Sequence, residues 1–198
     1  MGAYQDSKLS RDVFEEKWSE RFAALFRHDA EEGKARWLPD QVFTRTEETV
    51  FYHPQPYYLR QDYRGLEQAL LHLGEDEFVV VDRDTLYGEK EHVGILFRLQ
   101  QRAGQVEETG RYHIEGQPSE FYAFGKRHDW GFVSSEPYNI GVLNAHEAIL
   151  DPFTAAWPGA DREEIQRYLE HTPSRYKNRF ESNYLERREG SSTSADYN

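Results

Sequence analysis

The clearest pattern near the start of the chain is a stripe of apolar residues spaced three and four positions apart. Between residues 10 and 27 these are Phe14, Trp18, Phe22, Leu25 and Phe26. This spacing places them on one face of an amphipathic helix. Ser10 is a suitable N-cap, because its hydroxyl can accept a hydrogen bond from a free backbone amide of the first turn. We therefore predict a helix here that packs an aromatic face on the rest of the protein.

A second, shorter helix is predicted after residue 62. Asp62 can cap its N-terminus, and Gly74 can end it, because glycine readily adopts the backbone conformation of a helix C-cap. Its apolar positions recur at helical spacing and are Leu66, Ala69, Leu70 and Leu73. This helix has one apolar side.

Strand patterns fill the middle of the chain. Residues 41–52 are rich in β-branched and aromatic side chains and indicate one strand or a short hairpin. Residues 78–81 form a short apolar run, and in residues 92–101 apolar positions alternate with more polar ones, which predicts a strand with one strongly buried face. Turn residues then separate further predicted strands, at 106–115, 120–127 and 130–134.

The last third of the chain has helical patterns again. Asp161 and Glu164 form a capping-box-like start to one helix, and Thr172 and Pro173 can cap and open another. Aromatic residues then recur every four positions, which is typical of a helix docked on the body of a protein. They are Tyr176, Phe180 and Tyr184.

Together these patterns predict an α+β protein. Amphipathic N-terminal helices pack on a curved antiparallel meander, and a helical extension follows it. We expect one domain over residues 1–188, with the sheet at about 41–134 and the C-terminal helices at about 161–188. The polar tail, 189–198, is expected to be disordered.

Composition excludes several kinds of chemistry. The 198 residues contain 36 Asp and Glu against 24 Lys and Arg, a net charge of −12, which disfavours nucleic acid as a partner. The absence of cysteine excludes disulfides, thiolate metal sites and a cysteine nucleophile, and the 8 histidines show no ligand spacing, so we predict neither a metal nor a cofactor. No apolar run suits a signal peptide or a membrane helix, so a soluble, cytoplasmic protein is expected.

The order of the elements resembles the nuclear transport factor two-like fold, which includes SnoaL-like polyketide cyclases and ketosteroid isomerases. The segment Arg64-Gly65-Leu66-Glu67 stands where that family commonly has Arg-Gly and an acidic residue at the start of a helix. The resemblance covers about residues 13–134 and implies a cone-shaped sheet around a pocket. The loop at 54–63 is long for the family, the C-terminal helices are additional, and no catalytic residue of the family can be matched here.

Four residues of the predicted meander form a candidate catalytic group. If neighbouring strands place Arg98 beside the strand that carries Arg111, His113 and Glu115, a cation, an imidazole and a carboxylate share one face. His113 would act as general base, Glu115 or Asp84 would hold its tautomer, and an arginine would bind an anionic oxygen. The alternative is a solvated sheet face with ordinary cross-strand charge pairs.

A proline-rich loop carries a second candidate group of five residues, Tyr52, His53, Tyr57, Tyr58 and Tyr63. Tyrosine provides a large contact area at low entropic cost, so this group would suit the rim of a ligand pocket or a protein-docking loop. Alternatively, these side chains only cover a helix.

Two functions follow from these observations. The first is an acidic ligand- or protein-binding module, of the inhibitor or immunity type, whose partner is a small apolar or anionic ligand or a basic protein. The alternative is a small cofactor-independent cyclase, isomerase or dehydratase with its pocket inside the sheet. Self-association as a homodimer is left open.

Overall fold

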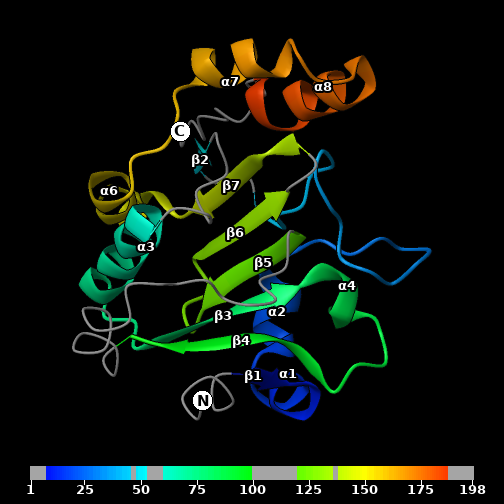
Figure 1. Cartoon of the computed structure of the whole chain (residues 1–198), viewed down its shortest axis with the longest axis vertical. Helices are drawn as coiled ribbons and strands as arrows, with labels where there is room; N and C mark the ends of the chain where they lie inside the picture. The colour runs from blue at the N-terminus through cyan, green and yellow to red at the C-terminus, as the bar shows by residue number, and fades with distance from the viewer. Residues whose placement is uncertain (1–7, 46–47, 53–59, 100–119, 136–137, 187–198) are drawn as a thin grey trace, which may run out of the picture.

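The computed structural model describes residues 8–45, 48–52, 60–99, 120–135 and 138–186, with only the backbone at 60–64. Within these residues the strands form one seven-stranded antiparallel sheet in the order β1-β4-β3-β5-β6-β7-β2. Helices pack on this sheet, which confirms the α+β class (Figure 1). The strands are β1 (Lys8–Ser10), β2 (Glu48–Tyr52), β3 (Glu77–Asp82), β4 (His92–Arg98), β5 (Glu120–Gly125), β6 (Trp130–Ser135) and β7 (Ile140–Ala145).

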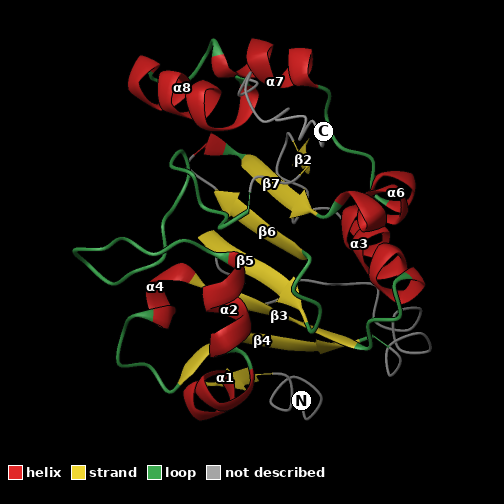
Figure 2. Cartoon of the chain, turned by 180° about the vertical axis from the view of Figure 1, so that it is seen from behind, coloured by secondary structure: helices red, strands yellow, loops and turns green. Residues whose placement is uncertain are grey.

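Helices cover both faces of the sheet. One face packs against α1, α2 and the C-terminal helices, and the other against α3 and α6. Figure 2 shows α2 and α4 in front of the strands, and Figure 1 shows α7 and α8 beside β7 and β2, at the opposite end of the sheet from α1. The helices are α1 (Arg11–Lys17), α2 (Ser19–Leu25), α3 (Arg60–His72), α4 (Arg83–Leu86), α6 (Glu147–Ala156), α7 (Arg162–Leu169), α8 (Ser174–Phe180) and a π-helical turn, η4 (Glu181–Leu185).

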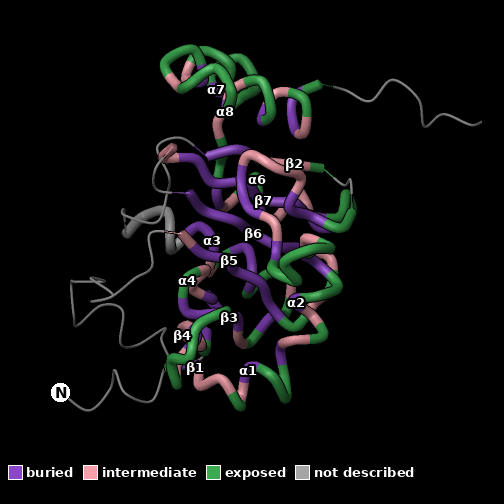
Figure 3. Tube along the Cα trace, turned by 90° about the vertical axis from the view of Figure 1, so that its right-hand side faces the viewer, coloured by how far each residue is buried: buried purple, intermediate pink, exposed green. Residues whose placement is uncertain are grey.

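Because both faces are covered, the central strands are buried on both sides. Every residue of β6 and β7 is buried, and so is every residue of β5 except Glu120 (Figure 3). The sheet face that α2 covers is largely aromatic. There the ring of Phe22 meets the ring of Tyr122 edge-on, with 5.0 Å between their centroids. On the opposite face, Trp157 stacks on Tyr52 at 4.1 Å. This burial on both sides explains why β5 has a nearly continuous apolar sequence.

The N-terminal helix forms where the apolar stripe predicts it, with one break. Trp18 interrupts it and separates α1 from α2. Ser10 is the N-cap, and its hydroxyl oxygen accepts a hydrogen bond from the Val13 amide at 3.3 Å. All five aromatic and leucine positions of the stripe are buried, which confirms the predicted packing face.

A β-bulge in β4 changes the predicted alternation. Leu9 pairs with Gly94 and Ser10 pairs with His92, so Val93 is the extra residue. Because a bulge shifts the side chains on one side of it to the other face, Val93 packs toward α1 and α2, whereas Ile95 and Phe97 pack toward α3. The alternation in residues 92–101 predicts that Val93, Ile95, Phe97 and Leu99 share one buried face, and Val93 does not.

Several predicted boundaries are corrected. The strand expected at 41–52 is limited to β2, and Asp62 lies inside the first turn of α3 instead of preceding it. The N-cap of α8 is Pro173, one residue after the predicted Thr172, because the helix begins at Ser174. The prediction did not include β1, α4, β7 or α6, so the sheet extends beyond the predicted residues 41–134 in both directions. The predicted strand at 106–115 and the tail at 189–198 lie outside the described residues.

One edge strand of the sheet is partly paired on its outer side, and the other is short. On the outer side of β2, the Ala160 amide donates a hydrogen bond to the Phe51 carbonyl at 2.7 Å. The opposite edge strand, β1, has three residues. No helix in the described part of the chain is long and apolar enough to cross a bilayer.

Gly65, of the Arg-Gly motif, lies where α3 crosses α6. A Cβ atom added to it would lie 2.5 Å from the Ala156 carbonyl oxygen and 3.1 Å from Trp157 Cβ. We expect Gly65→Ala to lower the free energy of unfolding by about 2 kcal/mol, because the two helices would have to separate. Urea unfolding measures this, with the exposed Gln68→Ala on α3 as the control that should change stability by less than about 0.5 kcal/mol. Equal stability of Gly65→Ala and the wild type would contradict the close crossing.

Candidate functional site

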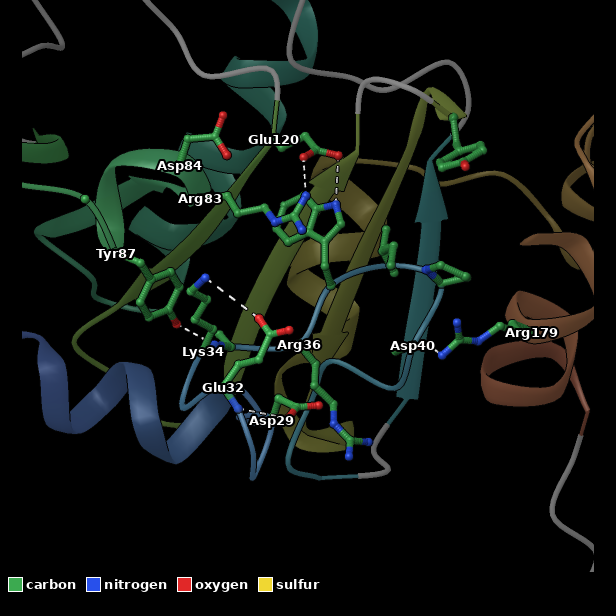
Figure 4. Close-up of a pocket in the computed structure, with 16 residues that line it drawn as sticks. Asp29, Glu32, Lys34, Arg36, Asp40, Arg83, Asp84, Tyr87, Glu120 and Arg179 are labelled. Carbon is green, nitrogen blue, oxygen red and sulfur yellow. Dashed lines mark hydrogen bonds and ion pairs between the residues drawn. The ribbon is translucent and has the colours of Figure 1, made fainter. Parts of the chain in front are cut away.

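An open cleft of about 700 Å³ lies on the α2 face of the sheet, at the end where β3 leads into α4 and β5 begins. Its walls come from the loop of residues 29–40, the segment of residues 83–88, the start of β5 and one residue of α8 (Figure 4). Loops at one end of a sheet are common positions for binding groups, because the rigid strands fix them in space. We therefore treat this cleft as the candidate site.

Glu120 is the central polar group of the cleft. Its Oε1 accepts a hydrogen bond from Trp37 Nε1 at 2.9 Å, and its Oε2 accepts one from the Arg83 guanidinium at 2.6 Å. The Arg83 guanidinium also lies over the Trp37 ring, 5.0 Å from its centroid. A charge-assisted hydrogen bond and a cation–π contact together hold the arginine in one orientation.

The loop of residues 29–36 forms one wall. Asp29 Oδ1 accepts hydrogen bonds from the amides of Glu31 and Glu32, at 2.8 and 3.2 Å, and these bonds lower the pKa of Asp29. Gly33 completes the turn with a φ of +65°, a conformation that suits glycine. The Asp29 side chain is thus used to shape the loop, while the Arg36 guanidinium makes no ion pair with any described residue.

Two tyrosines attach this loop to the sheet and to α4. The Tyr122 hydroxyl donates to the Arg36 carbonyl at 3.1 Å, and its ring meets Trp37 edge-on at 4.9 Å. The Tyr87 hydroxyl oxygen accepts a hydrogen bond from the Ala35 amide. Burial raises the pKa of both tyrosines, so both hydroxyls keep their protons at neutral pH.

Arg11 fixes the segment that carries Tyr87. Its guanidinium donates to the carbonyl oxygens of Thr85, Leu86 and Gly88 at 2.8, 3.0 and 2.6 Å. Thr85 and Leu86 end α4 and Gly88 lies just beyond it, so Arg11 adds donors to carbonyls at the C-terminal end of this helix. A residue from the start of α1 therefore positions one wall of the cleft.

The C-terminal helices build the opposite wall. Arg179 of α8 forms an ion pair with Asp40. Asn183 Nδ2 donates to the Pro39 carbonyl at 2.9 Å, and the Tyr184 hydroxyl donates to the Asp40 carbonyl at 2.7 Å. Tyr176, Phe180 and Tyr184 are buried, as their spacing predicts. The helical extension thus shapes the site as well as docking on the body.

The predicted catalytic group is only partly within the described residues. Arg111, His113 and Glu115 lie outside them. Arg98 is exposed at the end of β4, opposite Glu77, and does not line the cleft. Asp84, the alternative partner for His113, does line it. The catalytic hypothesis stays a prediction.

The predicted tyrosine group is likewise divided. Tyr52 is only 3% exposed, and its hydroxyl donates to the Trp157 carbonyl at 3.0 Å, so this member belongs to the core under α6 and not to a rim. His53, Tyr57 and Tyr58 lie outside the described residues. Tyr63 lies in α3, where only the backbone is described.

Sequence reasoning did not predict the group formed by Trp37, Arg83 and Glu120. Glu120 is 83 residues from Trp37 and 37 residues from Arg83, so no local spacing connects them. The only available signal was the placement of polar residues at strand ends. Glu120 begins β5, and Arg83 directly follows β3.

Metal chemistry has no support in the described part of the chain, where no three histidine, aspartate or glutamate side chains converge to hold an ion.

Comparisons with protein-family models, with curated proteins and with solved structures find no match to this chain. The resemblance to the nuclear transport factor two-like fold therefore stays a prediction.

Proposed function

We propose that this chain is a binding protein and that the cleft between α4, α8 and the loop of residues 29–40 takes up a polar ligand or a polar segment of a partner. The observation that carries the proposal is the cleft itself. Its volume of about 700 Å³ falls in the range of ligand sites, roughly 300–1,000 Å³.

The polar groups of the cleft are held in place before any ligand arrives. Glu120 orients Arg83, and Asp40 pairs with Arg179. The two tyrosines and Arg11 fix the flanking loops. A binding site gains affinity from such order, because little conformational entropy is lost when the ligand binds.

Two groups of the cleft have pKa values that are shifted away from neutrality. Hydrogen bonds from backbone amides lower the pKa of Asp29, and burial raises the pKa of Tyr87. Both shifts move the pKa further from 7, whereas a general acid or base works best with a pKa near the operating pH. Neither group is therefore suited to exchange protons with a substrate near pH 7.

Native mass spectrometry of the protein isolated gently from its own host tests this function. The wild type is expected to retain a bound small molecule or partner chain. The double variant Lys34→Glu, Glu16→Lys should lose it, because the exposed positive charge of Lys34 at the cleft is reversed, while the compensating change lies on α1 and the net charge stays at −12.

The matched control exchanges two exposed neighbours on α1, Glu16→Lys with Lys17→Glu, which also leaves the net charge unchanged. It should keep the same bound mass as the wild type. If both double variants keep that mass, or if the wild type carries none, the proposal that the cleft is a binding site is wrong.

A further inference from the structure

Arg83 has hydrogen-bond donors that the described part of the protein does not use. Both Glu120 oxygens and Asp29 Oδ1 accept hydrogen bonds from the protein, and Asp40 is paired with Arg179. On the donor side, Arg83 uses one terminal nitrogen, and its Nε and second terminal nitrogen have no acceptor among the described residues. Arg83 therefore has unused donors beside its bond to Glu120.

Lys34 and Tyr87 are two further groups of the cleft with unused donors. The Lys34 ammonium meets Glu32 only loosely, at 3.8 Å, with both side chains more than half exposed. The Tyr87 hydroxyl accepts a bond from Ala35 N, and its own proton has no acceptor among the described residues. In Figure 4 the Lys34 ammonium lies beside Tyr87 and reaches toward α4 and Arg83, whereas the Arg36 guanidinium points outward beside Asp29.

The acidic groups that line the cleft are partly neutralised. Its lining contains five acidic and four basic side chains, a net charge of −1. Glu120 and Asp40 are neutralised by their arginine partners. Asp84 lies at the rim (Figure 4). The two carboxylates that are paired with arginine therefore add little repulsion to an anion in the cleft.

We propose that the ligand of the cleft carries an oxyanion, a carboxylate or a phosphate group, held by the Arg83 guanidinium together with the Lys34 ammonium and the Tyr87 hydroxyl. This inference rests on the proposed function, because it assigns a ligand class to the same cleft. Arginine presents a planar fork that matches both carboxylate and phosphate, and stacking on Trp37 holds that fork in one plane.

Nuclear magnetic resonance titrations of the 15N-labelled full chain test the inference. The probes are inorganic phosphate and succinate, each added at constant ionic strength. The signal to follow is the Trp37 indole N–H, assigned with Trp37→Phe, because this group shares Glu120 with Arg83. One of the two probes is expected to shift this signal to saturation, and the one that does so distinguishes a phosphate from a carboxylate ligand.

Four substitutions locate the anion. Arg83→Gln should weaken binding about tenfold or more, since a hydrogen bond to a charged group is lost, and Arg83→Lys should weaken it less. Lys34→Gln should weaken binding about two- to fivefold. Asp84→Asn should strengthen it by a similar factor, because a negative charge is removed and the exposed side chain makes no contact that the fold needs.

Lys90→Gln is the matched control. It removes the same charge as Lys34→Gln, but at an exposed side chain that does not line the cleft, so the affinity should change by less than about twofold. Equal losses for Lys34→Gln and Lys90→Gln would overturn the inference, because only general electrostatic attraction would remain. The absence of a saturable shift with both probes would also overturn it.

The two proposals fail in different ways. If the mass retained from the host is lost in the Lys34→Glu, Glu16→Lys variant but neither probe shifts the Trp37 signal, the cleft is a binding site and the oxyanion assignment is wrong. If no retained mass depends on the cleft and neither probe binds, both proposals are wrong.

Discussion

Replacing Gly94 with alanine is expected to lower the free energy of unfolding by about 3 kcal/mol or more. A Cβ atom at this position would overlap the Val80 carbonyl oxygen and lie 2.9 Å from Val81 Cα. Both atoms belong to the backbone of β3, which cannot move away without losing its pairing with β4 or β5. Overpacking that only flexible side chains must relieve costs about 1–3 kcal/mol, so a clash with a central strand should reach or exceed that range. Equilibrium unfolding in urea measures the loss.

Gly33→Ala provides the comparison for this experiment. No atom lies within 4 Å of a Cβ added there, but the φ of Gly33 is +65°. Its expected cost is therefore backbone strain alone, about 1–2 kcal/mol. A Gly94→Ala protein as stable as Gly33→Ala would show that β3 and β4 tolerate a side chain at their closest approach.

Glu75→Ala is expected to lower the free energy of unfolding by about 3 kcal/mol. The Glu75 carboxylate is 4% exposed and accepts hydrogen bonds from the amides of Lys126 and Arg127, at 3.2 and 3.0 Å, and from Trp130 Nε1 at 3.3 Å. These donors lie in and beside the turn between β5 and β6. Alanine would leave them without this acceptor, and each buried donor left unpaired costs about 1–3 kcal/mol.

The next residue in the chain provides the control. Asp76 pairs with Lys126 at 2.7 Å, but its side chain is 52% exposed, so Asp76→Ala should cost less than about 1 kcal/mol. Glu75→Gln keeps an acceptor oxygen and should recover part of the loss. If Glu75→Ala and Asp76→Ala have equal effects in urea unfolding, the Glu75 hydrogen bonds do not stabilise the turn as described.

Local patterns predicted much of the fold, because the physics behind them is local. Ser10 and Asp161 cap α1 and α7 through hydrogen bonds that span three residues. The buried face of α3 and its end at Gly74, with a φ of +75°, also follow from spacing and from glycine conformation alone. These features need no information from distant parts of the chain.

The errors occur where tertiary packing overrides local preference. Gly141 and Asn144 interrupt the apolar pattern of β7, which nevertheless lies between β6 and β2. Helix α6 contains Pro152 in its interior and is capped by a histidine, whose Nδ1 accepts a hydrogen bond from the Ala148 amide. Proline ordinarily ends a helix. Packing of Ile149 and Phe153 into the core under α6 offsets that cost.

The cleft could not be predicted for a related reason. Trp37 comes from a loop, Arg83 from α4 and Glu120 from β5, and they meet only because β3 and β5 are neighbours in the sheet. Each residue is unremarkable in its own segment. Strand order was therefore the missing information, and it depends on long-range pairing that a single sequence does not reveal.

The surroundings of the two edge strands determine how other molecules can approach this protein. The backbone of Ala160 already occupies part of the outer side of β2, and β1 offers three residues at the opposite edge. A foreign strand that extended the sheet would have to displace the chain beside β2 or pair with a very short ribbon. Among the described residues, addition of a foreign strand at either edge is thus disfavoured, which limits aggregation through these edges.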